Sequence, residues 1–171
     1  MWARRHGASF APAKYELFHL TRSPKRFNMA ATIQIQECEV TPRTVIRVLG
    51  VQIDSKLRWG PHIRQVQAKM ARQNLALSRV TASTWGATFF KARQVYSAVI
   101  RPAITYGAPI WHSITDIRAR KSQNQRCSTL QNIGLRTVSG AFRATPIPVL
   151  KAECTIPLID LYMDSLHASF H

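Results

Sequence analysis

The chain of 171 residues is long enough to bury one sizeable core, and its 46% hydrophobic residues exclude a compositionally disordered protein. Its 24 Lys and Arg residues against 8 Asp and Glu give a formal net charge of +16. This charge favours polyanionic partners, nucleic acid before acidic membrane surfaces. No run of about 18 uncharged apolar residues occurs, so we expect no membrane-spanning helix.

The acidic residues are unevenly distributed. Between Asp54 and Glu153 the only acid is Asp116, so ion pairs within this region cannot neutralise its cations. Solvent, counterions or a phosphate-bearing partner must do so. The pattern indicates nucleic-acid binding, with a generic basic protein as the alternative.

Three cysteines lie far apart, at Cys38, Cys127 and Cys154, and no CxxC pair occurs. This spacing argues against a zinc module and gives no support to a disulfide framework. We therefore expect reduced cysteines in an intracellular protein, in the nucleus or the cytoplasm.

The first third of the chain has the pattern of β-strands. Residues 14–22 are apolar on both faces, which predicts a buried strand, and residues 32–40 alternate, which predicts a half-exposed strand. Residues 44–53 predict a third strand after a short turn, and neighbouring strands are expected to pair antiparallel. Gly50 inside this run indicates a bulge or a close approach of the backbone.

The stretch from residue 48 to residue 63 changes from a strand pattern to a helix pattern, with Pro61 expected in the first helical turn. Residues 62–82 are the clearest predicted helix, with one apolar arc and one cationic side. The arc consists of Ile63, Val66, Met70, Leu77 and Val80. The other side carries Arg64, Arg72 and Arg79, with Lys69 at its edge.

Residues 88–106 predict a second helix, with a cap expected at Ser83 or Thr84, and Pro102 is expected to kink it or to end its regular hydrogen bonding. The expected apolar face consists of Phe89, Ala92, Val95, Tyr96, Val99, Ile100 and Ala103. The aromatic residues Trp85, Tyr96 and Trp111 are expected in the core rather than as platforms for stacked bases.

Residues 118–139 predict a polar helix that ends at a Gly140 cap. Its expected apolar stripe consists of Cys127, Leu130, Ile133 and Thr137. Four cations crowd its first half, where the helix dipole disfavours them: Arg118, Arg120, Lys121 and Arg126. Residues 145–157 are expected to be extended or briefly helical, and residues 159–169 to form a last helix. The prediction is therefore an α+β fold, a small antiparallel sheet followed by a helical bundle.

Several short motifs, in this order along the chain, resemble one protein family. They are KYELFHLTR at 14–22, LGVQID and LRWGPHI at 49–54 and 57–63, STWG at 83–86, VIRP at 99–102, YGAPIW at 106–111, LQN at 130–132 and GAFRATP at 140–146. Together they resemble the end of the palm and the following helical region in reverse transcriptases of non-LTR (LINE-type) retrotransposons.

The resemblance implies a domain division and an activity. Residues 1–57 would be the C-terminal part of a reverse transcriptase palm, and residues 58–171 a helical thumb and connection region. The chain would be a truncated RNA-directed DNA polymerase whose Met1 is an internal methionine of a longer ancestor. The family uses Mg²⁺ held by palm aspartates. No Asp-Asp pair occurs here, so we assign no catalytic residue, metal site or cofactor and expect the chain alone to be inactive.

The resemblance also implies contacts with a nucleic-acid primer–template. Lys14 matches a lysine that lies near the incoming nucleotide in the family, and Gly50 lies in the stretch that cradles the primer end. Phosphate contacts are expected from Arg64, Lys69, Arg72, Arg79, Lys91 and Arg93. Two alternatives stay open: a free-standing basic RNA- or DNA-binding protein, and a retroelement relic without function. The sequence does not indicate an oligomeric state.

Overall fold

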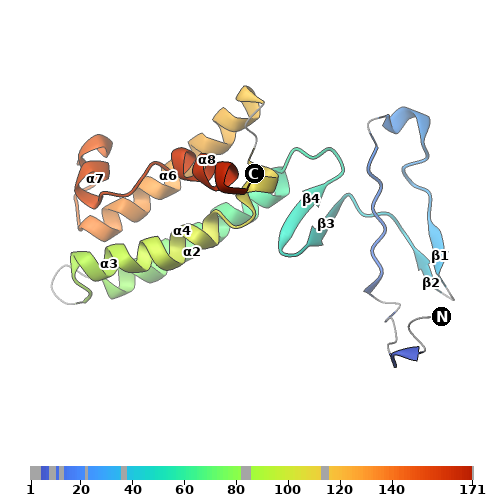
Figure 1. The fold of residues 1–171 in the computed structure, drawn as a ribbon, viewed down its shortest axis with the longest axis horizontal. Coiled ribbons are helices and arrows are strands. Elements are labelled where there is room, and N and C mark those ends of the chain that lie inside the picture. Colours follow the sequence, from blue (N-terminus) through green and yellow to red (C-terminus); the bar gives the residue numbers. More distant parts are fainter. Residues whose placement is uncertain are drawn as a thin grey trace. The chain divides into compact units, whose positions relative to one another are not determined.

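The structure, a computed structural model, describes residues 5–7, 11, 14–21, 23–35, 38–81, 86–112 and 116–170. The chain divides into two compact units, Met1–His62 and Ile63–His171, each of which is described by itself (Figure 1). Strands occur in the first unit and helices dominate the second, which confirms the predicted α+β fold. The assignment of palm and thumb to residues 1–57 and 58–171 stays a prediction.

The first unit contains two separate two-stranded antiparallel sheets. Its elements are η2 (Pro24–Arg26), β1 (Ile33–Ile35), β2 (Cys38–Val40), β3 (Val45–Val48) and β4 (Val51–Asp54). In the first sheet Ile33 is paired with Val40, and in the second Val45 is paired with Asp54. Both sheets join strands that are consecutive in the chain, as short connections favour.

The strand predictions for this unit were partly wrong. Residues 32–40 and 44–53 each form a hairpin instead of one strand. Leu49 and Gly50 have φ angles of 48° and 90°, the pair of positive values that a type I′ hairpin turn requires, so Gly50 lies in a turn and not in a bulge. Residues 14–21 do not form the predicted strand. Their pairing is an isolated parallel β-bridge between Leu17 and Pro42.

Little of the first unit is buried. Among its described residues, only Val51 and His62 are buried, at 5% and 3% relative exposure. Six large apolar side chains are exposed: Leu20, Phe27, Ile33, Val48, Leu49 and Leu57. Isolated hairpins are marginally stable in water, and the described residues of this unit bury little apolar surface.

The second unit is helical, and its first helix begins in the last residues of the first unit. The helices are α2 (Gly60–Val80), α3 (Phe89–Val95), η3 (Tyr96–Ile100), α4 (Arg101–Ile104), α5 (Ala108–Trp111), α6 (Ile117–Ser139), α7 (Ile147–Cys154) and α8 (Ile159–Phe170). All the helices predicted from periodicity are present, with ends within about three residues of the predicted ones. In the described part of the chain, no helix combines the length and apolarity needed to cross a bilayer.

A continuous core joins α2, the α3–α4 segment, α6 and α7. It contains Val66, Met70, Leu77, Ala92, Tyr96, Ile100, Ile104, Leu135, Val138, Leu150, Cys154 and Ile156. Tyr96 and Trp111 have 0% exposure, which confirms the prediction that they are core residues. The predicted arc of α2 is buried except for Val80, which is 52% exposed at the end of the helix. Trp85 and the predicted cap at Ser83 or Thr84 lie outside the described residues.

Pro102 interrupts the second predicted helix as expected. The five residues of η3, immediately before α4, form a π-helical turn, which is a local adjustment of the kind that accompanies a missing N–H group. The buried residues therefore recur at every fourth position: Ala92, Tyr96, Ile100 and Ile104. The prediction that Val95 and Val99 are buried was wrong, since they are 41% and 56% exposed.

Helix α6 ends at Gly140 in the left-handed conformation, with φ of 65°, which confirms the predicted cap. Its buried face contains Cys127, as predicted, but also the polar residues Gln123 and Gln131. Ile133, which was predicted to be buried, is 47% exposed. A pattern search that counts only apolar residues therefore misplaces the buried face of α6.

Candidate nucleic-acid interface

Helix α2 carries an exposed cationic side along most of its length. Arg64, Lys69, Arg72 and Arg79 are all exposed, whereas Ile63, Val66, Met70 and Leu77 on the opposite side are buried. Arg64, Arg72 and Arg79 are eight and seven residues apart, so they lie within a sector of about 80° on the helix and span roughly 22 Å along its axis. We call these three arginines and Lys69 the α2 basic side.

No carboxylate of the described residues lies within ion-pair distance of the α2 basic side. Among the described residues, Arg43 is paired with Glu16, and Arg120 and His112 are paired with Asp164. Arg72 donates its Nε–H to the carbonyl of Ala68 in its own helix at 3.4 Å, a long contact. The charge of this side is therefore available to solvent or to an anionic ligand.

The two predicted cations of α3 have different surroundings. Lys91 is exposed. Arg93 donates its Nε–H to the carbonyl of Cys154 at 2.6 Å and an Nη–H to the carbonyl of Thr155 at 3.2 Å. These carbonyls lie at the C-terminus of α7, where unpaired carbonyls and the helix dipole both favour a cation. Arg93 thus has a structural role that its sequence context did not indicate.

Lys14 and Gly50 belong to the first unit. Lys14 is exposed, and its backbone N–H donates to the carbonyl of Ala11 at 3.0 Å. Gly50 lies in the β3–β4 turn, half-buried. These positions do not test whether Lys14 contacts a nucleotide or Gly50 a primer end, so both predicted contacts stay predictions.

The connection from β4 to α2 is fixed by two side chains. Asp54 accepts hydrogen bonds from the backbone N–H of Trp59 at 2.7 Å and of Arg58 at 3.1 Å, and so stabilises a loop in which Trp59 has a positive φ. The backbone N–H of Gln52 donates to Nδ1 of His62 at 3.3 Å. Both contacts lie in the stretch where the sequence changes from a strand to a helix.

The His62 contact makes this connection sensitive to pH. Burial lowers the pKa of the His62 imidazole, and Nδ1 can accept the Gln52 N–H only while it is unprotonated. The unfolded chain then takes up the proton first as pH falls below about 6.5. We expect the stability contributed by His62 to be complete above that pH and to be lost as pH falls below it. Thermal unfolding at a series of pH values should show this slope in the parent and a weaker one in His62→Gln.

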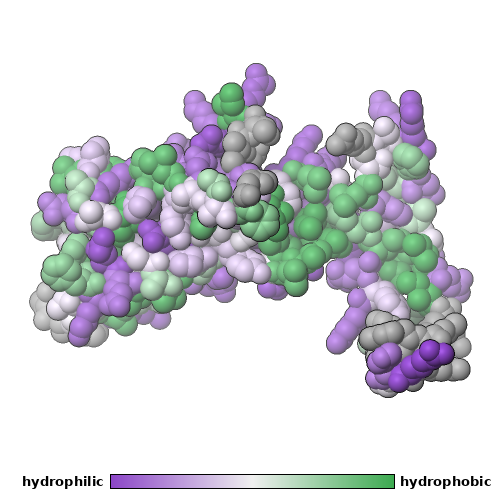
Figure 2. Space-filling view, in the orientation of Figure 1, coloured by the Kyte–Doolittle hydropathy of each residue, from purple (hydrophilic) through white to green (hydrophobic). Residues whose placement is uncertain are grey.

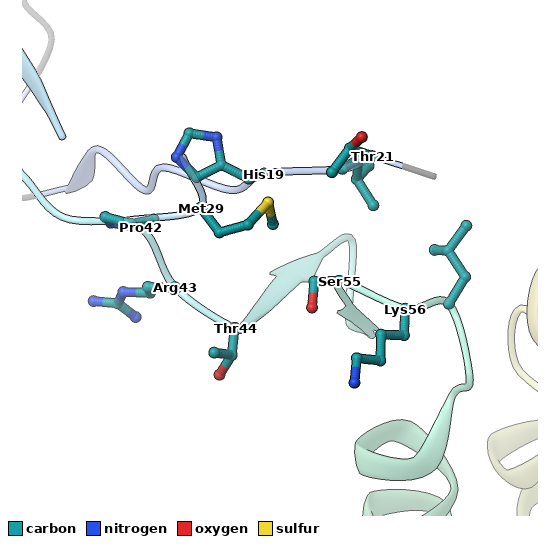
Figure 3. A pocket seen from close by; sticks show the side chains of 10 residues that line it. His19, Thr21, Met29, Pro42, Arg43, Thr44, Ser55 and Lys56 are labelled. Carbon is teal, nitrogen blue, oxygen red and sulfur yellow. The ribbon is translucent and has the colours of Figure 1, made fainter. Parts of the chain in front are cut away.

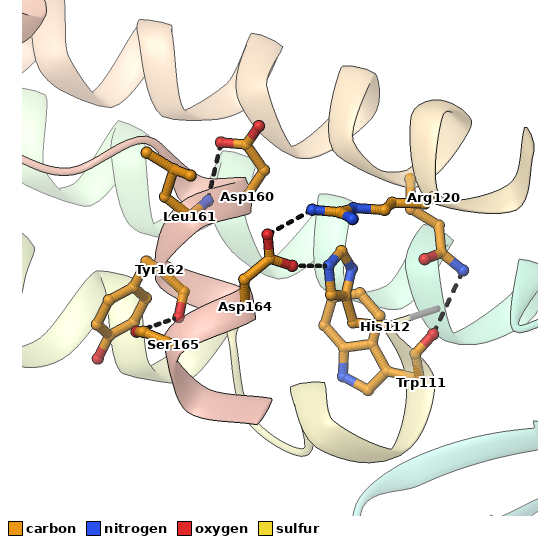
Figure 4. A network of polar contacts seen from close by, with 9 residues as sticks. Trp111, His112, Arg120, Asp160, Leu161, Tyr162, Asp164 and Ser165 are labelled. Atoms are coloured by element: carbon orange, nitrogen blue, oxygen red, sulfur yellow. Dashed lines mark hydrogen bonds and ion pairs between the residues drawn. The ribbon is translucent and has the colours of Figure 1, made fainter. Parts of the chain in front are cut away.

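A polar cluster that the sequence did not predict joins α5, α6 and α8 (Figure 4). Asp164 lies between His112, whose Nε2 is 3.1 Å from Oδ1, and Arg120, which is bonded to Oδ2. The His112 side chain is completely buried, and Asp164 is partly exposed. The pair is separated by 52 residues, and no local spacing could have indicated it. The cluster connects helices, and its geometry indicates a structural role.

The first unit contains a pocket of about 810 Å³ (Figure 3). Its lining residues are His19, Leu20, Thr21, Met29, Pro42, Arg43, Thr44, Ser55, Lys56 and Leu57. Arg43 is paired with Glu16 at 2.8 Å, and His19 Nε2 contacts the carbonyl of Ala31 at 2.9 Å. The size is typical of ligand pockets, but these polar groups already have protein partners and form no nucleophile–base pair.

The described residues do not contain a metal centre. No group of three or more His, Cys, Asp or Glu residues among them could bind a metal ion. The carboxylates of Asp54, Asp116 and Asp164 accept hydrogen bonds from backbone or side-chain donors of their own surroundings. These residues therefore do not fit the pair of Mg²⁺ ions that a polymerase of the resembled family uses.

A comparison with known proteins gives one informative similarity. The chain is 25% identical over 104 residues to a protein of 115 kDa in the type-1 retrotransposable element R1DM of Drosophila melanogaster. The match covers 61% of this chain and 10% of that protein. This similarity supports an origin in a non-LTR retrotransposon. No family model and no solved structure matches the chain.

Proposed function

We propose that this chain is part of a retrotransposon RNA-directed DNA polymerase, and that its helical unit binds the sugar-phosphate backbone of a primer–template duplex. The observation that carries the proposal is the α2 basic side, a group of exposed cations on one side of the helix with no described carboxylate in ion-pair distance. Guanidinium groups suit phosphate because they donate paired hydrogen bonds in a fixed geometry. Such contacts position a duplex without reading its sequence.

The burial pattern of the first unit supports a role as part of a larger domain. Among the described residues of this unit the only buried apolar one is Val51, and two hairpins with so little buried apolar surface are marginally stable by themselves. The chain spans only about a tenth of the retrotransposon protein that it matches. The motifs of the first unit resemble the end of a polymerase palm, a sheet that other segments of such an enzyme would complete.

Charge removal on α2 tests the binding. We expect Arg64→Gln/Arg72→Gln/Arg79→Gln to weaken binding to a fluorescein-labelled duplex and to lower the slope of log affinity against log salt by roughly 0.9 for each phosphate that is no longer neutralised. The measurement is fluorescence anisotropy over a series of salt concentrations. These side chains are exposed and make no described ion pair, so the variant should keep the stability of the parent.

A charge-matched control separates a localised site from net charge. Lys25→Gln/Arg26→Gln/Arg143→Gln removes three exposed cations that do not belong to α2. We expect this control to change the salt slope much less than the α2 variant. Equal slopes in the two variants would show that only net charge matters and would contradict the proposal.

Polymerase activity is not expected from this chain by itself. Primer extension with Mg²⁺ or Mn²⁺ requires clustered carboxylates, and the eight acids are scattered along the sequence. We therefore expect no extended primer on a sequencing gel, with an intact retrotransposon polymerase as the positive control. Extension by the purified chain would mean that its scattered acids form a centre after all.

A further inference from the structure

The first half of α6 presents a second cationic face. Arg118, Lys121 and Arg126 are exposed, and Ser122 and Gln125, which lie between them on the same face, are also exposed and polar. The opposite side packs against the bundle, where Gln123 donates to the carbonyl of Trp111 at 3.3 Å. We call Arg118, Lys121 and Arg126 the α6 basic face.

Helix stability does not account for the cations at the start of this face. Arg118 lies in the first turn, where the helix dipole disfavours positive charge, and Arg118 and Lys121 are like charges three residues apart. The cap residue Asp116 accepts hydrogen bonds from the backbone N–H groups of Arg118 and Ala119. No described carboxylate lies within ion-pair distance of the α6 basic face, and the nearby Asp164 is paired with Arg120 and His112.

The N-terminal end of the α6 basic face, at Arg118, is distant from the hydrogen bond that joins α6 to α2, whereas Arg126 precedes Leu130 by only four residues, roughly 6 Å along the helix. In that hydrogen bond the carbonyl of Leu130 accepts from the Asn74 amide at 3.1 Å. Arg118 precedes Leu130 by twelve residues, roughly 18 Å along the helix. The first turns of α6 extend past the neighbouring helices in Figure 1, and Figure 2 shows hydrophilic side chains around its start.

We propose that the α6 basic face is a second nucleic-acid contact, which binds the phosphate backbone separately from the α2 basic side. The arginines would donate paired hydrogen bonds to phosphate oxygens, and Ser122 and Gln125 offer neutral donors of the kind that also contact phosphate and sugar. A phosphate partner neutralises charges that the protein itself leaves without a carboxylate. This contact does not depend on binding by α2.

Binding measurements with the same labelled duplex test this face. We expect Arg118→Gln/Lys121→Gln/Arg126→Gln to reduce the salt slope by roughly 0.9 for each phosphate that the face neutralises in the parent, while Lys25→Gln/Arg26→Gln/Arg143→Gln changes it much less. A slope equal to that of the charge-matched control would overturn the inference. If the α2 variant binds like the parent and the α6 variant does not, the proposed role of α2 fails and this inference stands.

A stability measurement excludes an unfolding artefact. Arg118→Glu/Lys121→Glu places acidic groups in the first turns of α6, where the helix dipole favours them. We expect the midpoint of thermal unfolding to rise while affinity for the duplex falls. A higher midpoint with unchanged affinity would show that the face is merely solvated, which would also overturn the inference.

Discussion

Replacing Gly134 with alanine is expected to destabilise the helical unit by roughly 3 kcal/mol, because α6 has no space for a methyl group at this position. A Cβ there would collide with Cε2 of Tyr96 and lie 2.9 Å from Oδ1 of Asn74. Tyr96 is completely buried and Asn74 is 3% exposed, so neither side chain can move into solvent. Alanine would otherwise stabilise a helix interior by about 1 kcal/mol relative to glycine.

Urea unfolding followed by circular dichroism measures this effect. Gln125→Ala, an exposed position on the same helix, is the control and should change stability by less than about 0.5 kcal/mol. Tyr96→Leu should be less harmful in the Gly134→Ala background than in the parent, since the smaller side chain removes the collision. Parent-like stability of Gly134→Ala would mean that α6 can move away from Tyr96 of η3 and Asn74 of α2 more easily than their packing indicates.

Replacing Gln131 with leucine is expected to destabilise the attachment of α8 by about 1–3 kcal/mol. Gln131 is completely buried on α6, accepts the backbone N–H of Ile159 at 3.0 Å through Oε1 and donates Nε2–H to the carbonyl of Pro157 at 2.8 Å. The Ile159 N–H is at the first turn of α8, where helical partners are lacking. Leucine has a similar volume but leaves both backbone groups without a partner.

Hydrogen exchange locates the consequence. We expect amides of α8 to exchange faster in Gln131→Leu, whereas those of α2 should change less, because Asp164 and Ile159 connect α8 to α5 and α6. Gln125→Leu, exposed on the same helix, is the matched control. Uniform acceleration throughout the helical unit would show that Gln131 contributes to global stability instead of a local attachment.

The helices could be predicted from the sequence because their signals are local. Apolar residues at helical spacing located α2, and a glycine located the end of α6. The buried face of α6 could not be predicted, because Gln123 and Gln131 are buried through hydrogen bonds to distant backbone groups. A hydropathy pattern assigns both glutamines to the surface.

The strands were harder to predict for a physical reason. The β3–β4 turn is Leu49-Gly50, and leucine at a positive φ is not a residue that marks a hairpin turn. An apolar run through a turn therefore has the pattern of one longer strand. The residues of 14–21 have the composition of a buried strand, but among the described residues their pairing is limited to the bridge between Leu17 and Pro42.

The candidate site was predictable in exposure but not in bonding. The α2 basic side follows directly from the helical period, and the structure has all four cations exposed. The role of Arg93 depends on carbonyls that lie 61 and 62 residues further along the chain. The Asp164 cluster is non-local in the same way. Sequence spacing carries no information about such contacts.

The π turn of η3 determines which mutations the second helix can accommodate. A regular helix advances by about 40° beyond a full circle with every four residues, so positions spaced in fours would gradually rotate off a fixed face. The wide turn between Tyr96 and Ile100 offsets part of that rotation and keeps Ile104 in phase with Ala92. A one-residue deletion in this turn would shift the phase of every later residue of the helix. Insertions and deletions here are therefore expected to be far more harmful than point substitutions at Val95 or Val99.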